Sequence, residues 1–269
     1  MSRAARVLLT LAGLAAACPQ AGAGGFGPEA FAAFVDAQGE RAAPRLYAYR
    51  GEVYDVPGGQ LVATVEGYQQ ARVFPVANAR SQAFVARRAV LLYRAPGTGA
   101  VLRVYPDVRA SVTAPPLGLV RYTLSGDEVR SESVSGTRAA ARSLDVPENL
   151  DAHREGADWV FRRVLRPPNP VEQPVEIQES VVRPGPGPAS GRIRSVMTKV
   201  ANNTVIFAPG GRHVLHLVWR PVENWSALPP GVREFLDREA PGMKTLPASL
   251  EDSLAELGLP AFPSVGPRP

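Results

Sequence analysis

The sequence predicts a mainly β protein, in which an antiparallel meander closes into a barrel or a sandwich-like sheet, with short N-terminal and C-terminal helices. The first supporting observation is a series of about ten runs that are rich in β-branched and aromatic residues. The second is that segments rich in glycine and proline separate these runs. The third is that apolar residues recur at helical spacing near the two ends of the chain.

The first predicted element is a short helix that follows a glycine-rich segment. Pro28 suits the first turn of a helix. Phe31, Phe34 and Val35 then share one helical face, and Gly39 ends the helix.

The strands follow in a regular series. Turn residues supply a fixed or positive φ between them, as in residues 57–59 and 96–99. We expect strands at residues 45–56, 61–74, 81–93, 101–105, 117–124, 128–134, 159–165, 175–182, 193–200, 204–208 and 213–220.

Residues 139–156 interrupt this series and contain few β-forming residues. Asp145, Glu148 and Asp151 lie in this segment, but their spacing matches no calcium-binding loop. We therefore expect a solvated acidic loop here.

The chain changes character from about residue 229. Residues 231–240 place Val232, Phe235 and Leu236 on one helical face. Ser249 with Asp252 then forms a capping pattern for a last helix. We expect this helical segment to plug or flank the sheet.

Residues 1–23 have the anatomy of a secretory signal peptide. Arg3 and Arg6 precede an apolar run at residues 7–17, and small residues at 21–23 fit a cleavage site. The sequence therefore predicts export to the periplasm or beyond, and residues 24–269 as a single β-rich domain. The run is shorter than the ~20 apolar residues that a transmembrane helix needs.

Cys18 offers an alternative way to process this segment. It is the only cysteine of the chain, and residues 14–18 resemble a bacterial lipoprotein box. In that case Cys18 would carry a lipid anchor. Otherwise cleavage before Gly24 leaves a domain with no cysteine and no disulfide, which its core alone must stabilise.

The net charge of +5 does not indicate a nucleic-acid partner. The basic pairs at residues 87–88 and 162–163 lie in predicted strands, where neighbouring side chains face opposite ways. They form no continuous basic stripe, so we expect no nucleic-acid binding.

The sequence predicts no metal and no cofactor. His213 and His216 lie in a predicted strand and would therefore point to opposite faces, which argues against a shared metal. No phosphate-binding loop with its lysine and no serine nucleophile elbow occurs.

The strand at residues 61–74 is the best candidate for a binding site. Its odd-numbered face is small and apolar apart from Gln69, whereas its even-numbered face carries Glu66, Tyr68 and Arg72. The even face is either an ordinary solvated face or the lining of a barrel lumen. In a lumen, Glu66 could act as a base and Arg72 as an anion clamp, with Tyr47 and Tyr49 as aromatic walls.

Several strand-and-turn motifs resemble a known bacterial family. These are LYAYRGEVY at residues 46–54, LYRAPGTGAVL at residues 92–102, and Trp159 followed by PNP at residues 168–170. They resemble the bacterial domain-of-unknown-function family number 1838, over residues 43–175. The chain departs from that pattern at Ala95 and at residues 105–106. The resemblance implies a β-rich protein and no established activity.

Three functions are open from the sequence. The first is a β-barrel that binds a small, partly apolar ligand in the cell envelope. The second is an acid–base enzyme, such as a cyclase, isomerase or hydrolase, in the same cavity. The third is a structural or interaction protein without a pocket. The sequence does not decide among these three functions and does not define the oligomeric state.

Overall fold

The structure is a computed structural model that describes residues 26–76, 79–102, 117–134, 146–165, 175–185, 191–202 and 212–260. Its elements are α1 (Pro28–Gln38), β1 (Arg45–Val56), β2 (Leu61–Pro75), β3 (Gln82–Arg94), β4 (Gly118–Ser125), β5 (Glu128–Val134), β6 (Val146–Glu148), β7 (Leu150–Glu155), β8 (Asp158–Leu165), β9 (Val175–Arg183), β10 (Gly191–Asn202), β11 (Arg212–Val222), η2 (Trp225–Ala227), α2 (Pro230–Arg238), η3 (Pro241–Lys244) and α3 (Leu250–Glu256).

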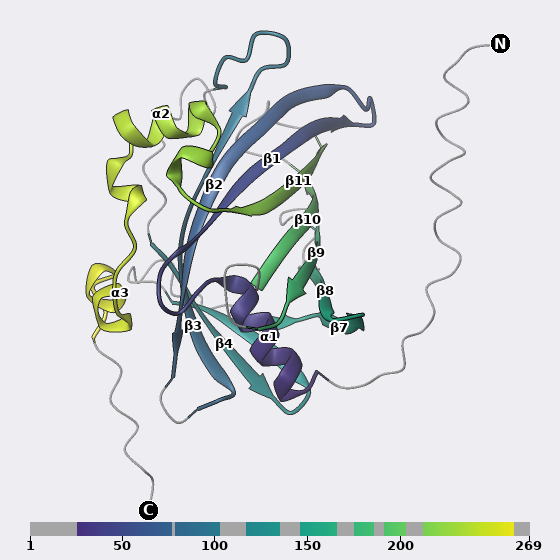
Figure 1. Ribbon diagram of the computed structural model, residues 1–269. Helices are drawn as coiled ribbons and strands as arrows, with labels where there is room; N and C mark the ends of the chain where they lie inside the picture. Colours follow the sequence, from purple (N-terminus) through teal and green to yellow (C-terminus); the bar gives the residue numbers. More distant parts are fainter. Residues whose placement is uncertain are drawn as a thin grey trace, which may run out of the picture.

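The strands form one sheet of eleven in the order β6-β5-β4-β3-β2-β1-β11-β10-β9-β8-β7. The neighbouring pairs are antiparallel, and apart from β1 with β11 each strand pairs with a neighbour in the chain. The sheet curls into a nearly closed barrel (Figure 1). This confirms the predicted antiparallel meander closed into a barrel, with short helices near both ends.

Residues 146–155 bring the two edges of the sheet together. Their first part, β6, pairs with β5, and their second part, β7, pairs with β8. At the junction, the Val164 amide donates a hydrogen bond to the Asn149 carbonyl oxygen at 3.0 Å. The prediction of a loop is therefore wrong for residues 146–155, whereas the predicted solvent exposure of Asp151 is confirmed. Backbone pairing with the two sheet edges outweighs their weak intrinsic β propensity.

Helix α1 lies inside the curve of the sheet (Figure 1). It contacts β2, β4, β8, β9 and β10, which surround it. Its residues Phe31 and Phe34 are almost fully buried, and they pack with Phe26, Tyr122 and Phe161 in one apolar cluster. Burial of a phenylalanine side chain contributes about 1.5–3 kcal/mol, so the helix is a principal part of the interior core.

The C-terminal helices cover the outer face of β2 and β3 (Figure 1). Val232 and Leu236 of α2 pack on Tyr68 and Val90 in one apolar cluster. Leu254 of α3 belongs to a second apolar cluster. Residues of both faces of the sheet are therefore buried in this region. Of the two predicted arrangements, in which this segment plugs or flanks the sheet, the structure shows the second.

Some expectations fall outside the described residues. They include residues 1–23, with the predicted signal peptide and Cys18, and the predicted strand at residues 204–208. Of the predicted strand at residues 101–105, only Val101 and Leu102 are described, and Val101 forms an isolated bridge with Arg94.

Candidate functional site

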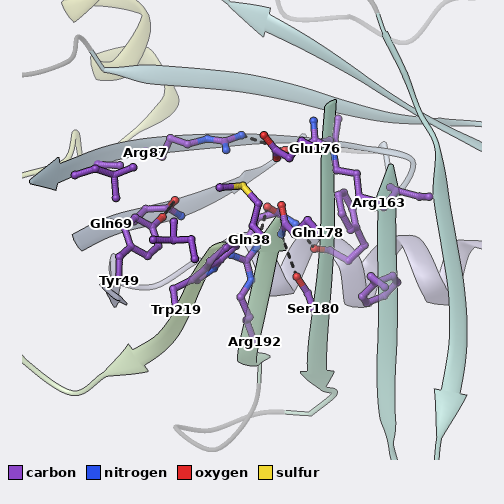
Figure 2. A pocket seen from close by; sticks show the side chains of 18 residues that line it. Gln38, Tyr49, Gln69, Arg87, Arg163, Glu176, Gln178, Ser180, Arg192 and Trp219 are labelled. Atoms are coloured by element: carbon purple, nitrogen blue, oxygen red, sulfur yellow. Dashed lines mark hydrogen bonds and ion pairs between the residues drawn. The ribbon is translucent and has the colours of Figure 1, made fainter. Parts of the chain in front are cut away.

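The interior of the barrel contains a cavity of about 220 Å³, next to the end of α1. Register explains which side chains reach it. Tyr49 of β1 pairs with Gly67 of β2, and Trp219 of β11 pairs with Tyr49, so both aromatic rings take the face that points inward. Figure 2 shows Tyr49, Gln69, Trp219 and Arg192 around this space.

Arg192 is the most deeply buried charged residue of this wall, with an exposure of only 3%. Its Nη2 donates to Gln38 Oε1 of α1 at 3.1 Å. Its guanidinium carbon lies 5.3 Å from the ring centroid of Tyr47 and 5.5 Å from that of Trp219. Helix α1 and the two rings thus fix the arginine in place, in contacts that are favourable for a cation.

The buried donors of this wall include two from neighbouring residues that have no hydrogen-bond partner among the described residues. They are Arg192 Nε and Trp219 Nε1. The Trp219 ring is held by an edge-to-face contact with Tyr49, with ring centroids 5.5 Å apart. A buried donor without a partner is costly, and both donors belong to residues of the cavity wall. An acceptor that reached them from the cavity would therefore be favoured.

The phenols of the interior are neutral hydrogen-bonding groups. The Tyr49 hydroxyl donates to Gln69 Oε1, and the Tyr47 hydroxyl donates to the Ala37 carbonyl oxygen at 3.3 Å. Burial raises the pKa of both Tyr47 and Tyr49 above the ordinary tyrosine value. Neither phenol therefore supplies a base at neutral pH.

The charged groups described in the cavity wall carry a surplus of positive charge. Arg87, Arg163 and Arg192 line it together with one carboxylate, Glu176. Glu176 lies 4.0 Å from Arg163 Nη1 and 3.9 Å from Lys199 Nζ. This carboxylate is therefore already shared between two cations. The cavity favours electron-rich guests.

The structure divides the five predicted site residues between the two faces of the sheet. Tyr47 and Tyr49 lie inside the barrel, whereas Glu66, Tyr68 and Arg72 lie on its outer face. The prediction that all five line one lumen is wrong. Because β-strand side chains alternate, the small odd-numbered face of β2 turns toward α1 and the even-numbered face turns away.

The three outer residues have structural partners of their own. Tyr68 is fully buried beneath the C-terminal segment and donates to the Met243 carbonyl oxygen at 2.6 Å. Arg72 donates to the Ala42 carbonyl oxygen at 3.0 Å. Since C-terminal elements cover Tyr68, the alternative of a solvated face is also wrong at this position.

Glu66 lies in an open outer groove of about 500 Å³ and forms an ion pair with Arg94. The Arg94 Nε donates to Glu66 Oε1 at 2.7 Å. Glu66 does not reach the interior cavity, so the proposed base and the proposed anion clamp do not converge on one ligand.

Sequence reasoning missed the interior arginines, although a signal was present. Each of the two basic pairs directs one member inward: Arg87 and Arg163 line the cavity, while Arg88 donates outward to the Thr245 carbonyl oxygen. The prediction that the members of a pair face opposite ways is confirmed at residues 87–88. A second signal was Gln69, the single polar residue of the small, apolar face of β2.

Neither a metal site nor a membrane helix is found where the structure describes the chain. No group of three or more histidine, cysteine, aspartate or glutamate side chains is placed to hold a metal ion in this part. None of the helices described here is long and apolar enough to cross a membrane.

Comparisons with known proteins add little. No protein-family model and no curated protein matches the sequence. Among solved structures, the chain is similar to one described as "Structure of EF1p2_mFAP2b bound to DFHBI", with 8% identity and a TM-score of 0.19, over 70% of this chain and 95% of that one. A TM-score of this size supports no conclusion about a ligand. The resemblance to family number 1838 stays a prediction.

Proposed function

We propose that this protein is an exported β-barrel that binds a small, partly apolar molecule in its interior cavity. The observation that carries the proposal is the pair of buried donors, Arg192 Nε and Trp219 Nε1, which have no partner among the described residues and belong to residues that line the interior cavity. A barrel that served only as a scaffold would gain stability from an apolar filling at this position.

The size of the cavity suits one ring with a small substituent. A cavity of about 150 Å³ lined by apolar side chains is known to hold benzene. The volume of about 220 Å³ found here leaves room for one polar group beside such a ring.

The apolar part of the wall supplies the affinity. Leu91, Met197, Leu217 and Phe161 line the cavity together with the aromatic rings. Burial of apolar surface is worth roughly 25 cal/mol per Å², whereas the polar groups orient the ligand.

We favour this proposal over the two other functions left open by the sequence. The acid–base enzyme depended on Glu66, which is paired with Arg94 outside the cavity. The scaffold without a pocket depended on a filled, apolar interior, which the arginines and glutamines of the wall do not provide.

Native mass spectrometry of the protein purified from its own envelope fraction tests the proposal. We expect one small molecule bound per chain and a polypeptide mass that begins at Gly24. A mass that retains residues 1–23 in a cytoplasmic fraction would contradict export, and an acylated Cys18 would support the lipoprotein alternative. A protein that carries no ligand and binds no ring compound would contradict the binding function.

A further inference from the structure

We propose that the ligand of this cavity is an organic anion, a single-ring carboxylic acid whose carboxylate is bound by Arg192 and Trp219. The inference rests on the proposed function and adds the charge and the chemical class of the ligand. It follows from three features of the cavity wall: the environment of Arg192, the neighbouring donor of Trp219, and the space beside them.

Arg192 is a buried cation without a carboxylate partner in the described part of the chain. Its polar contact there is with Gln38, a neutral amide, and its other neighbours are the ring faces of Tyr47 and Trp219. A buried charge is costly unless an opposite charge accompanies it. Glu176, the carboxylate in the described wall, lies beside Arg163 and Lys199 instead.

Arg192 and Trp219 are neighbours in the cavity wall. The guanidinium carbon lies 5.5 Å from the Trp219 ring centroid, and both Arg192 Nε and Trp219 Nε1 are buried without a partner among the described residues. A carboxylate has two oxygens and can accept from both donors at once, and hydrogen bonds between charged groups are the stronger kind. A neutral amide offers one oxygen and would direct an N–H group toward one of these donors.

The remaining space suits a ring rather than an inorganic anion. The cavity wall also contains the apolar side chains of Leu217, Met197 and Phe161. A bare anion such as sulfate would leave these side chains uncovered. The ring of an aromatic acid would cover them while its carboxylate contacts the two donors.

The experiment is isothermal titration calorimetry of the full purified chain with three ligands of the same shape. Phenylacetate carries a negative charge, phenylacetamide is neutral, and phenethylamine is a cation. We expect phenylacetate to bind at least about tenfold more tightly than phenylacetamide, because the neutral amide loses one or more charge-assisted hydrogen bonds. We expect no binding of the amine.

Arg192→Met is the decisive variant, and Arg194→Met is its matched control. Both residues lie on β10, but the register shift between them pairs Arg192 with Val182 and Arg194 with Val181. Arg194 therefore takes the other face of the strand, where it is exposed. We expect Arg192→Met to lose the preference for the acid and Arg194→Met to keep it. Trp219→Phe removes one donor but keeps a ring, so it tests the same point if Arg192→Met fails to fold.

The outcomes separate the inference from the function on which it rests. Equal or tighter binding of phenylacetamide, or an acid preference that survives both Arg192→Met and Trp219→Phe, would overturn the anion inference and leave a ligand-binding barrel. Displacement of phenylacetate by sulfate at equal concentration would also overturn it, because the site would then recognise an inorganic anion. Failure of all three ring compounds to bind would overturn the proposed function itself.

Discussion

Replacement of Phe34 by alanine tests whether α1 is part of the barrel core. Phe34 is 5% exposed, and its ring centroid lies 5.2 Å from that of Tyr122 and 5.7 Å from that of Phe161. Truncation of a buried phenylalanine to alanine costs about 3–5 kcal/mol, since apolar burial is lost and a void remains. We expect a loss of this size in the free energy of unfolding.

Urea unfolding followed by tryptophan fluorescence measures this loss. With a slope of about 2–3 kcal/mol per M, a change of 3–5 kcal/mol lowers the midpoint by roughly 1–2.5 M. Ala32→Ser is the control, because Ala32 is an exposed residue of the same helix, and its effect should stay within about 0.5 kcal/mol. A loss below about 1 kcal/mol for Phe34→Ala would refute the packing of α1 inside the sheet.

The same variant has a consequence for binding. Phe34 lines the cavity, so its removal joins the volume of a phenyl ring to the space already present. We expect Phe34→Ala to bind 1-naphthylacetate, a two-ring acid, when measured by calorimetry. The parent protein should exclude this ligand by its size.

Three further predictions follow from the contacts described above. Tyr68→Phe removes a hydrogen bond to the Met243 carbonyl, so it should cost about 0.5–1.5 kcal/mol in urea unfolding and leave phenylacetate binding unchanged, because Tyr68 lies outside the barrel. Burial raises the pKa of Tyr47, Tyr49 and Tyr68. The neutral phenols therefore contribute fully to the free energy of unfolding below about pH 10, and this contribution is lost as the pH rises further. Tyrosinate absorbance should show these three residues ionising only as the protein unfolds. Ser249→Ala removes the N-cap of α3 and should cost about 0.5–2 kcal/mol in the same urea assay.

The strand pattern of the sequence predicts most of the sheet but not the orientation of β2. The alternation of small and large side chains in residues 61–74 is the alternation found in the structure. It does not show which face is interior, because Tyr68 and Phe74 on one face and Ala63 and Val73 on the other are all buried. The outer face is covered by helices more than 150 residues later in the chain, as the bond from Tyr68 to Met243, with a sequence separation of 175, illustrates.

The segment at residues 146–155 was not predicted for a different physical reason. Pro147 and Asp151 disfavour strands, and local preference therefore indicates a loop. The strand arises from pairing with two edges that are distant in the chain, so only the closed barrel accounts for it. Arg192 was missed in the same way: it precedes the predicted strand, and the register shift between Arg192 and Arg194 in β10 cannot be read from the sequence.

A crystal structure of the protein with 4-bromophenylacetate tests the central claim most directly, because the anomalous signal of bromine locates the ring. We predict one bromine peak inside the barrel, with the carboxylate density against Arg192 and Trp219. A peak in the outer groove beside Glu66 and Arg94, or no peak at a concentration that saturates binding in solution, would contradict an interior ligand site.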